Sequence, residues 1–488
     1  MKKFVITAAA CLIFAVSLVS GETNCYTYDR WGEIEESPDT YRVDKVSGWR
    51  ELGLDIPLVN PSGSFAAGNE LYICDTGNDR IIELKYNPDR TFTLLRIIKH
   101  FNAGGKVKET FASPSDIFAG SNGDMFICDT NNGRVVKLDR DLNFLLEFRE
   151  PDDPTYDKKL SFMPVKIVAD VAGRVYLLAK NVNRGFLKYE SDGTFTGFYG
   201  ASEVHPKIAD IIWKKLATRN QKKRMESFVP TEYSNACLDK DGFIYAATRT
   251  FDEWDLKSDK AKPVRRLNAL GKDILIKNAT YPPIGDLQWG DAAGYKGPSR
   301  FTDVTVFDDD AYVVLDDTRG RLFGYNSQGY LLFAFGGRGN IDGFFKKPVA
   351  LDHINRDLFV LDSMDCTLTV FSPTDFGNMI YEALDEYAAG WYDRSAELWS
   401  KVMHLNGNYD LAYIGLGKSA LRNEQYKSAM EYFKLKWDAK DYSKAFVLYR
   451  REWVEHNLGR MAALVLVLII VPLAIKKIRK IKEEVEQS

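Results

Sequence analysis

Short alternating runs of apolar and polar residues cover much of the chain, and one hairpin pattern occurs twice, at 71–82 and 125–136. Each copy places Asp, Thr, Asn and Gly between two β-rich runs. Because Asp, Asn and Gly tolerate positive φ and bond their own turn backbone, each copy predicts a strand, a tight turn and a second strand. Such a unit cannot bury its apolar faces alone, and repetition at about 40–50 residues is typical of propeller blades.

Weaker copies of the hairpin begin at positions 175, 243, 313 and 358. A further apolar run, such as 115–119, precedes most copies, and another, such as 144–148, follows most of them. Four strands per repeat is the pattern of a propeller blade. The sequence therefore predicts a mainly β fold, with a six-bladed β-propeller over 58–377 that a strand near 49–54 would close.

The turn between the two strands carries a resemblance to a known family. Its pattern is an Asp that ends one strand, an Asn in the turn and an Arg that opens the next strand. The pattern is complete at Asp75, Asn78, Arg80, Asp129, Asn132 and Arg134, and partial at Asp316, Arg321 and Asp362. It resembles the NHL repeat family of bacterial, gluconolactonase-like six-bladed propellers.

The resemblance is weaker in the other copies. Ala179 replaces the Asp in the third copy, Thr367 replaces the Arg in the sixth, and the fourth copy keeps neither residue. We interpret the Asp and Arg of this motif as structural, because a charge-assisted hydrogen bond across a hairpin fixes its geometry without chemistry.

Residues 378–457 change to helical spacing rich in Ala, Leu and aromatic residues. Tyr392 and Tyr426 are 34 positions apart, as are Trp399 and Phe433, and small residues follow each tyrosine. Large side chains beside small ones at this period resemble the tetratricopeptide repeat, in which paired antiparallel helices stack. The resemblance predicts a small TPR-like helical domain; the alternative is a plain helical stalk with an aromatic core.

Two apolar segments indicate export and anchoring. Lys2 and Lys3 precede an apolar run, which predicts a signal peptide at 1–21, followed by a lead-in at 22–57. The second segment predicts a transmembrane helix at 458–477 and a basic cytoplasmic tail at 478–488. The predicted location is the cell membrane, crossed once, with the N-terminal domain outside (extracellular or periplasmic) and the C-terminus in the cytoplasm.

The length of the second segment leaves an alternative open. The fifteen apolar residues at 461–475 form only ~22 Å of helix, against a hydrocarbon core of ~30 Å. A buried core helix has the same length. The segment shows no polar face, and basic residues follow it, which favours the membrane helix.

Charge and cysteine content narrow the functional classes. The net charge of −3 implies no nucleic-acid partner, because phosphate binding needs an excess of basic residues that this chain lacks. Five cysteines remain after the predicted cleavage, which argues against a fully paired disulfide framework, and Cys74 and Cys128 resemble core residues of neighbouring blades. A basic helical insertion at 203–229 would meet an anionic membrane surface or an acidic partner, or would simply be solvated.

No local motif for catalysis or metal binding is visible, so the sequence predicts no catalytic residue and no cofactor. The resemblance to gluconolactonase-like propellers nevertheless implies a divalent metal, Ca²⁺ or Zn²⁺, in the central channel of a lactonase-like hydrolase. Asp116, Asp303 and Asp352 begin blades, where their side chains could face this channel. Trp254, Trp289 and Tyr295 lie in polar or Gly-rich stretches and form a candidate platform for a carbohydrate or peptide ligand.

The function favoured by the sequence is a membrane-anchored extracytoplasmic binding or scaffold protein. The propeller and TPR-like helices would present surfaces to protein partners, such as a transporter permease or a solute-binding protein of a surface transport system. The alternatives are a metal-dependent lactonase-like hydrolase and a carbohydrate-binding propeller.

Overall fold

The computed structural model describes residues 25–29, 31–104, 107–159, 161–180, 182, 184–201, 233–249, 262–279, 281–287 and 297–486. The predicted signal peptide and the insertion at 203–229 lie outside these residues. The chain divides into two compact units, Met1–Asn378 and Met379–Ser488, which are described separately.

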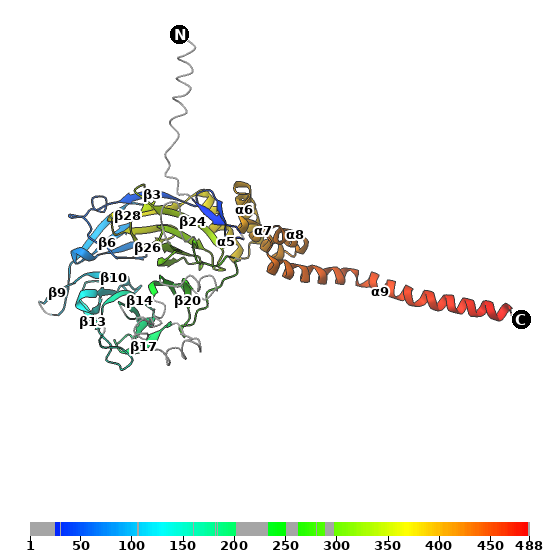
Figure 1. Ribbon diagram of the computed structural model, residues 1–488, viewed down its shortest axis with the longest axis horizontal. Coiled ribbons are helices and arrows are strands. Elements are labelled where there is room, and N and C mark those ends of the chain that lie inside the picture. The colour runs from blue at the N-terminus through cyan, green and yellow to red at the C-terminus, as the bar shows by residue number, and fades with distance from the viewer. Residues whose placement is uncertain are drawn as a thin grey trace, which may run out of the picture. The chain divides into compact units, whose positions relative to one another are not determined.

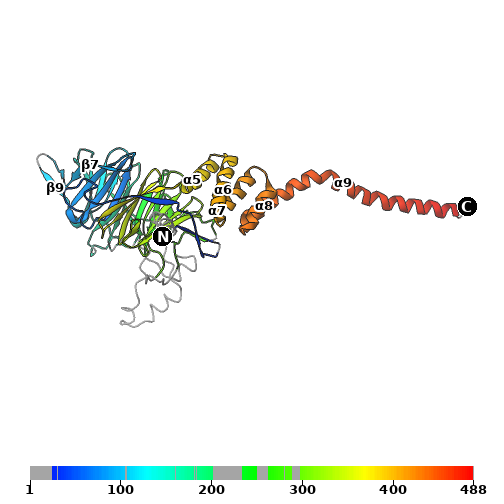
Figure 2. The same ribbon diagram turned by 90° about the horizontal axis from the view of Figure 1, so that it is seen from above.

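The first unit is a mainly β propeller of antiparallel sheets (Figures 1 and 2). Three sheets have four strands in chain order. They are β4 (Gly63–Ala67), β5 (Glu70–Asp75), β6 (Arg80–Tyr86) and β7 (Phe92–Ile98); β10 (Pro114–Ala119), β11 (Met125–Asp129), β12 (Arg134–Leu138) and β13 (Phe144–Phe148); and β14 (Pro164–Ala169), β15 (Val175–Ala179), β16 (Phe186–Tyr189) and β17 (Phe195–Tyr199).

Two further sheets use strands from the N-terminal segment. The first contains β21 (Phe301–Val306), β22 (Tyr312–Asp316), β23 (Arg321–Tyr325) and β24 (Leu331–Arg338), extended by β1 (Tyr26–Tyr28), β2 (Ile34–Glu36) and β25 (Phe344–Phe345). The second contains β26 (Pro348–Ile354), β27 (Asp357–Asp362), β28 (Thr367–Pro373) and β3 (Tyr41–Ser47). The described residues also form β18 (Tyr233–Leu238), β19 (Ile244–Thr248) and β20 (Val264–Leu267), and the small pair β8 (His100–Asn102) and β9 (Lys108–Thr110).

The strand that completes the last sheet is β3, which pairs with β28 from Ser47 opposite Leu368 to Tyr41 opposite Pro373. The predicted closing strand near 49–54 was therefore wrong. Those residues form turns, because local backbone hydrogen bonds link Leu52 to Gly48 and Leu54 to Trp49, and Gly53 has φ +73°. The earlier segment carries the alternation that a strand needs, with Tyr41 and Ser47 fully buried.

One edge strand of each larger sheet lies on the inside of the propeller. These inner strands contact one another in the order β4, β10, β14, β18, β21, β26 and back to β4. In Figure 1, β10, β14 and β26 lie nearer the middle of the propeller than β13 and β17 do. The propeller axis is therefore lined by inner strands from distant parts of the chain.

The duplicated hairpin folds as its turn residues predict. A short 3-10 helix, Thr76–Asn78, follows β5, and Asp79 then adopts a left-handed conformation with φ +51° before β6 begins. The second copy uses Thr130–Asn132 and Gly133 (φ +61°) in the same way. Cys74 and Cys128 are buried and free, as expected of core residues.

The second unit is helical. Its helices are α5 (Asp375–Ala388), which begins at the end of the first unit, α6 (Tyr392–Leu405), α7 (Asp410–Arg422), α8 (Tyr426–Leu435) and α9 (Ala439–Glu486). Consecutive helices from α6 to α9 pack against one another. Trp399 and Phe433, which the sequence predicted as large core residues, are both buried.

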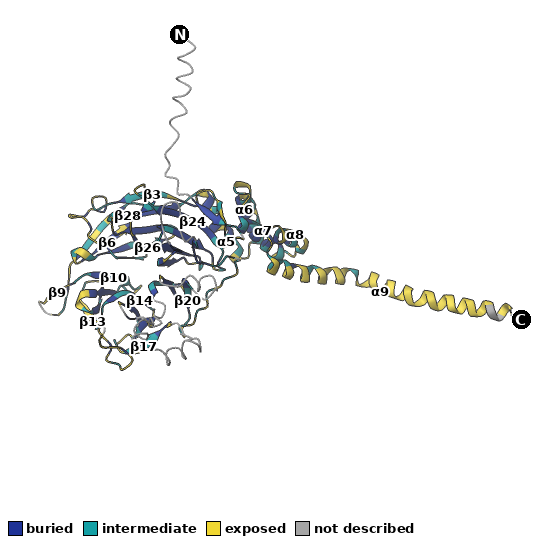
Figure 3. Cartoon of the chain, in the orientation of Figure 1, coloured by how far each residue is buried: buried dark blue, intermediate teal, exposed yellow. Residues whose placement is uncertain are grey.

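Helix α9 is continuous over 48 residues and contains the predicted membrane segment. Its residues 439–482 are long and apolar enough to cross a membrane, and the most apolar window has a mean hydropathy of 2.5 with none of it buried. Figure 3 shows this exposure along the helix. An unburied apolar helix excludes the alternative of a core helix within this chain and fits a single-pass membrane anchor.

Candidate functional site

The turn motif forms a structural brace in both complete copies. Asp75 Oδ2 accepts hydrogen bonds from Arg80 Nε at 2.6 Å and Asn78 Nδ2 at 2.8 Å, and its Oδ1 accepts one from Val59 N at 2.7 Å. The same contacts recur at 2.7–2.9 Å among Asp129, Arg134, Asn132 and the amide of Ala112. Each carboxylate thus ties its own hairpin to the preceding segment, which leaves it little room for chemistry.

The partial copies keep the carboxylate but not its arginine. Asp316 accepts backbone bonds from Arg300 and Thr318, and Asp362 accepts them from residues that include Lys346 and Lys347. Arg321 pairs with Asp286 instead of Asp316, although Asp316 lies opposite it in the strand ladder. The predicted role of Arg321 as the brace of this turn is therefore wrong.

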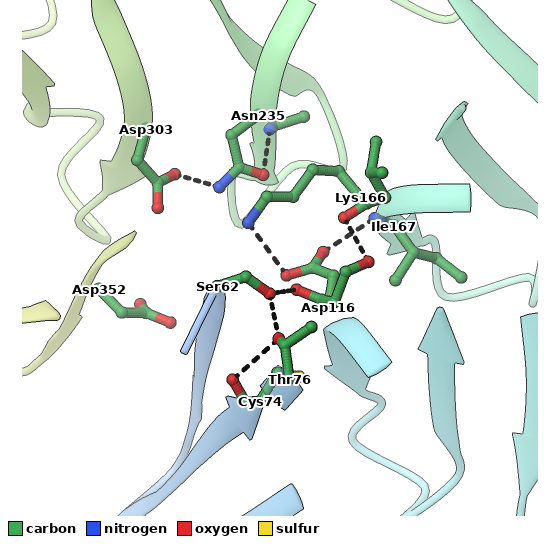
Figure 4. Close-up of polar contacts among 12 residues, drawn as sticks. Ser62, Cys74, Thr76, Asp116, Lys166, Ile167, Asn235, Asp303 and Asp352 are labelled. Carbon is green, nitrogen blue, oxygen red and sulfur yellow. Dashed lines mark hydrogen bonds and ion pairs between the residues drawn. The ribbon is translucent and has the colours of Figure 1, made fainter. Parts of the chain in front are cut away.

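The three residues predicted to face the channel lie around one hollow. Asp116 on β10, Asp303 on β21 and Asp352 on β26 line one hollow on the propeller axis, although the sequence separates them by up to 236 positions. Figure 4 shows the three carboxylates around a common space, together with Lys166 and Asn235. The structure thus brings the three candidates to one hollow.

Each of these carboxylates joins its blade to the following one. Oδ2 of the aspartate accepts a backbone N–H from the next inner strand: Asp116 from Ile167 at 2.9 Å, Asp303 from Leu351 at 2.8 Å and Asp352 from Ala66 at 2.5 Å. An inner strand has no ladder partner on its channel side, so its N–H groups need such acceptors. The carboxylates therefore act first as links between blades.

Lys166 and Asn235 complete the cluster and were missed by the sequence reasoning. Lys166 Nζ lies 3.3 Å from Asp116 Oδ1, and Asn235 Nδ2 donates to Asp303 Oδ1 at 2.5 Å. Both residues stand just after a β-bulge in their inner strand, as Asp116 and Asp303 do. Aligning the inner strands at that position would have found them.

Burial sets the protonation of the cluster. It raises the pKa of Asp303 to about 7, against the opposite pull of Lys166. It likewise raises the pKa of Asp352 to about 7, and the neighbouring charge of Asp303 adds to the effect. Burial disfavours the charge on Lys166, but the carboxylates of Asp116 and Asp303 outweigh it, so the lysine pKa is raised.

The cluster does not fit the divalent metal that the family resemblance implies. Among the described residues, no group of three or more His, Cys, Asp or Glu side chains is placed to hold a metal ion. The carboxylates face amide donors, and the Lys166 ammonium lies beside them. The hollow measures about 50 Å³, whereas small-molecule sites usually measure about 300–1,000 Å³. This cluster therefore does not support the metal or the lactonase-like activity, and both stay untested predictions of the resemblance.

The raised pKa values predict a pH-dependent stability. Asp303 and Asp352 have pKa values of about 7 when folded, against an ordinary 3.8. Their contribution to the free energy of unfolding is therefore complete below about pH 4 and lost as pH rises to about 7. We expect the stability advantage of the wild type over Asp352→Asn to fall by about 1–4 kcal/mol across this range, measured by denaturant unfolding. Asp141→Asn, on an exposed turn, is the control, and a difference that stays constant for Asp352→Asn would contradict the prediction.

A larger hollow lies between the first two blades. This interblade groove, of about 450 Å³, is lined by Phe65, Gly68, Glu70 and Tyr72 of one blade and by residues of the next that include Met125 and Arg140. Its volume falls within the range of small-molecule sites, about 300–1,000 Å³. Nothing in the local sequence marks it, because its two walls are some 50 positions apart.

A second surface hollow, of about 390 Å³, lies beside β1. The rings of Tyr28 and Tyr281 line it, with their centroids 4.6 Å apart, and Asp286 lies at its base. Asp286 is buried and accepts hydrogen bonds from Tyr26, Tyr28 and Arg321. The predicted ligand platform, Trp254, Trp289 and Tyr295, lies outside the described residues.

No protein-family model matches the chain, and no curated protein matches it either. Among solved structures, it is similar to a streptogramin B lyase, at 12% identity and a TM-score of 0.40 over 69% of this chain and 100% of that chain. It is also similar to a virginiamycin B lyase from Staphylococcus aureus, at 12% identity and a TM-score of 0.40 over 68% of this chain and 99% of that chain. Likeness at this level carries no argument about activity, and the propeller assignment rests on the sheets described above.

Proposed function

We propose that the chain is a membrane-anchored, extracytoplasmic binding or scaffold protein that presents a propeller and a set of helices to protein partners. The observation that carries the proposal is α9, which packs against α8 near its start and continues without a break into an exposed apolar segment. A helical domain whose last helix continues into its own anchor is suited to holding partners at a membrane surface.

The proposed orientation follows from the charges around the apolar segment. Four basic residues lie in the 20 positions before it (Lys444, Arg450, Arg451 and Arg460), and five lie in the seven positions after it (Lys476, Lys477, Arg479, Lys480 and Lys482). Basic residues next to a membrane helix favour the cytoplasmic side, and their higher density after the segment favours a C-terminal end that lies inside. With the predicted signal peptide at 1–21, this orientation puts the propeller outside the cell membrane.

Small-to-large packing supports a TPR-like arrangement of the helices. Tyr392 and Tyr426, 34 positions apart, are the first residues of α6 and α8. An added Cβ at Gly415 would lie 2.4 Å from Trp399 Nε1, and one at Gly417 would lie 2.6 Å from Phe433 Cε1. The two glycines of α7 therefore make room for the two large rings, and stacked helices of this kind are interaction surfaces in the family that they resemble.

A six-bladed ring of the NHL type is the finer form of the propeller that we propose. The three-stranded sheet β18–β20 stands between the sheets that begin with β14 and β21, and its inner strand contacts both. An antiparallel bridge from Leu267 to Asp273 continues this sheet beyond β20. The braces at Asp75 and Asp129 support the relationship to NHL repeats.

Crosslinking in cells tests the proposed function. We expect affinity capture of the full chain from solubilised membranes to recover other membrane or surface proteins, such as a transporter permease or a solute-binding protein. A chain without α6–α8 (residues 392–435), which keeps α9 and its anchor, should lose part of this set. Partners that are recovered equally with and without these helices would contradict the scaffold role.

A further inference from the structure

The interblade groove holds a donor and an acceptor that are fixed before any ligand arrives. Glu70 Oε2 accepts a hydrogen bond from the Tyr72 hydroxyl at 3.0 Å, and Glu70 Oε1 accepts one from Arg140 Nη2 at 2.9 Å. The side chains of Arg140 and Glu70 are 67% and 24% exposed, so both reach solvent at the groove. Polar groups held in place in this way lose little conformational freedom on binding.

The charges around the groove cancel. Glu83 lies beneath Tyr72, is buried, and forms an ion pair with Arg96. Arg96 Nη1 in turn donates to the backbone carbonyl of Arg140 at 2.8 Å. Two carboxylates thus face two guanidinium groups, and a ligand with a net charge would find no opposing excess charge here.

The floor of the groove is apolar and its rim is open. Phe65, which is half-buried, supplies apolar surface, and its ring lies 4.8 Å from that of Phe118. Gly68 stands at the rim with φ +58°, and no heavy atom lies within 4 Å of the position that a Cβ would take there. An apolar floor with a few fixed polar groups is the usual composition of a small-molecule site.

These features indicate which class of ligand the groove would bind. A hydroxyl group both donates and accepts, so a polyol could donate to Glu70 and accept from Arg140, while its C–H face packs on Phe65. We propose that the interblade groove binds a neutral polyhydroxylated ligand, a monosaccharide or disaccharide or the end of a glycan. The inference does not depend on the anchored scaffold role, and it uses none of the channel residues.

The test is calorimetric titration of the full chain in detergent with glucose, galactose, maltose, lactose and cellobiose, and with glucose 6-phosphate and glucosamine as charged comparators. We expect at least one neutral sugar to bind, and Arg140→Met and Glu70→Gln each to weaken that binding at least tenfold. Both variants should fold normally, because the Arg140 side chain is 67% exposed and the ion pair that they break lies at the surface. If a maltodextrin competes as well as maltose does, the ligand is the end of a glycan. If only maltose competes, the ligand is a free sugar.

Arg149→Met is the matched control, because Arg149 is also an exposed arginine paired with a glutamate, Glu147, but lies outside the groove. The affinity of the Arg149→Met variant for the sugar should stay within twofold of the wild-type value. Three results would each overturn the proposal: no binding of any neutral sugar, tighter binding of a charged comparator, or equal binding by the wild type and both groove variants.

Discussion

Replacing Arg80 by methionine is expected to lower the free energy of unfolding of the propeller by about 3–5 kcal/mol. The Arg80 side chain is 0% exposed, and its Nε lies 2.6 Å from Asp75 Oδ2. Its two terminal nitrogens donate to Asp55 and to the carbonyl of Ile56, each at 3.0 Å. Methionine keeps part of the volume but donates no hydrogen bond, so the Asp75 carboxylate stays buried without its ion-pair partner.

Denaturant unfolding of the detergent-solubilised full chain measures this effect. The control is Arg42→Met on β3, because Arg42 is 62% exposed and its contact with Asp44 is long, at 3.8 Å. That variant should change the free energy of unfolding by no more than about 0.5 kcal/mol. A loss of less than about 1 kcal/mol for Arg80→Met would show that the motif is not the structural brace described here.

The second large effect is expected in the helical unit, where Trp399→Ala should cost about 3–5 kcal/mol. Trp399 is the largest of the fully buried side chains in the described part of the chain, and its ring fills the space left by Gly415. Alanine would leave a cavity that the glycine cannot fill. Each 1.4 kcal/mol corresponds to a factor of about ten, so amide protection should fall at least a hundredfold.

Hydrogen exchange of peptides from α6, α7 and α8 reports this change locally. Trp391→Ala is the control, because Trp391 precedes α6 and is 62% exposed. Protection of the same peptides should then stay near the wild-type value. Equal effects of the two substitutions would mean that the helices do not depend on the packing of Trp399 against Gly415.

The elements with a strong local signal could be predicted from the sequence. The hairpins around Asp75 and Asp129 combine strand alternation with turn residues that accept positive φ, so both the strands and the brace at Arg80 follow from nearby residues. The helical period likewise placed Trp399 and Phe433 in a core. Asp116, Asp303 and Asp352 were chosen because they precede or lie within the first strands of blades, and they line one hollow in the structure.

Features that depend on partners far along the chain could not be predicted. Strand β3 was missed because its pairing with β28 joins positions more than 300 residues apart. Arg321 was assigned to Asp316 by analogy, but Asp286, in a loop before β21, accepts its hydrogen bond. The role of the channel carboxylates could not be predicted either. Their oxygens accept hydrogen bonds from backbone amides of neighbouring blades, and Asp116 also accepts one from the ammonium of Lys166.

If α9 anchors the chain as proposed, the propeller and the helices hold partners outside the membrane. Crosslinking of intact cells with a membrane-impermeant, lysine-reactive reagent, followed by capture and mass spectrometry, measures which lysines face outward and what they contact. We expect crosslinks from the propeller and from α6–α8 to membrane or surface proteins, and none from the tail lysines Lys476, Lys477, Lys480 and Lys482. Crosslinks from the tail without any from the propeller would rule out this orientation and the proposed scaffold role.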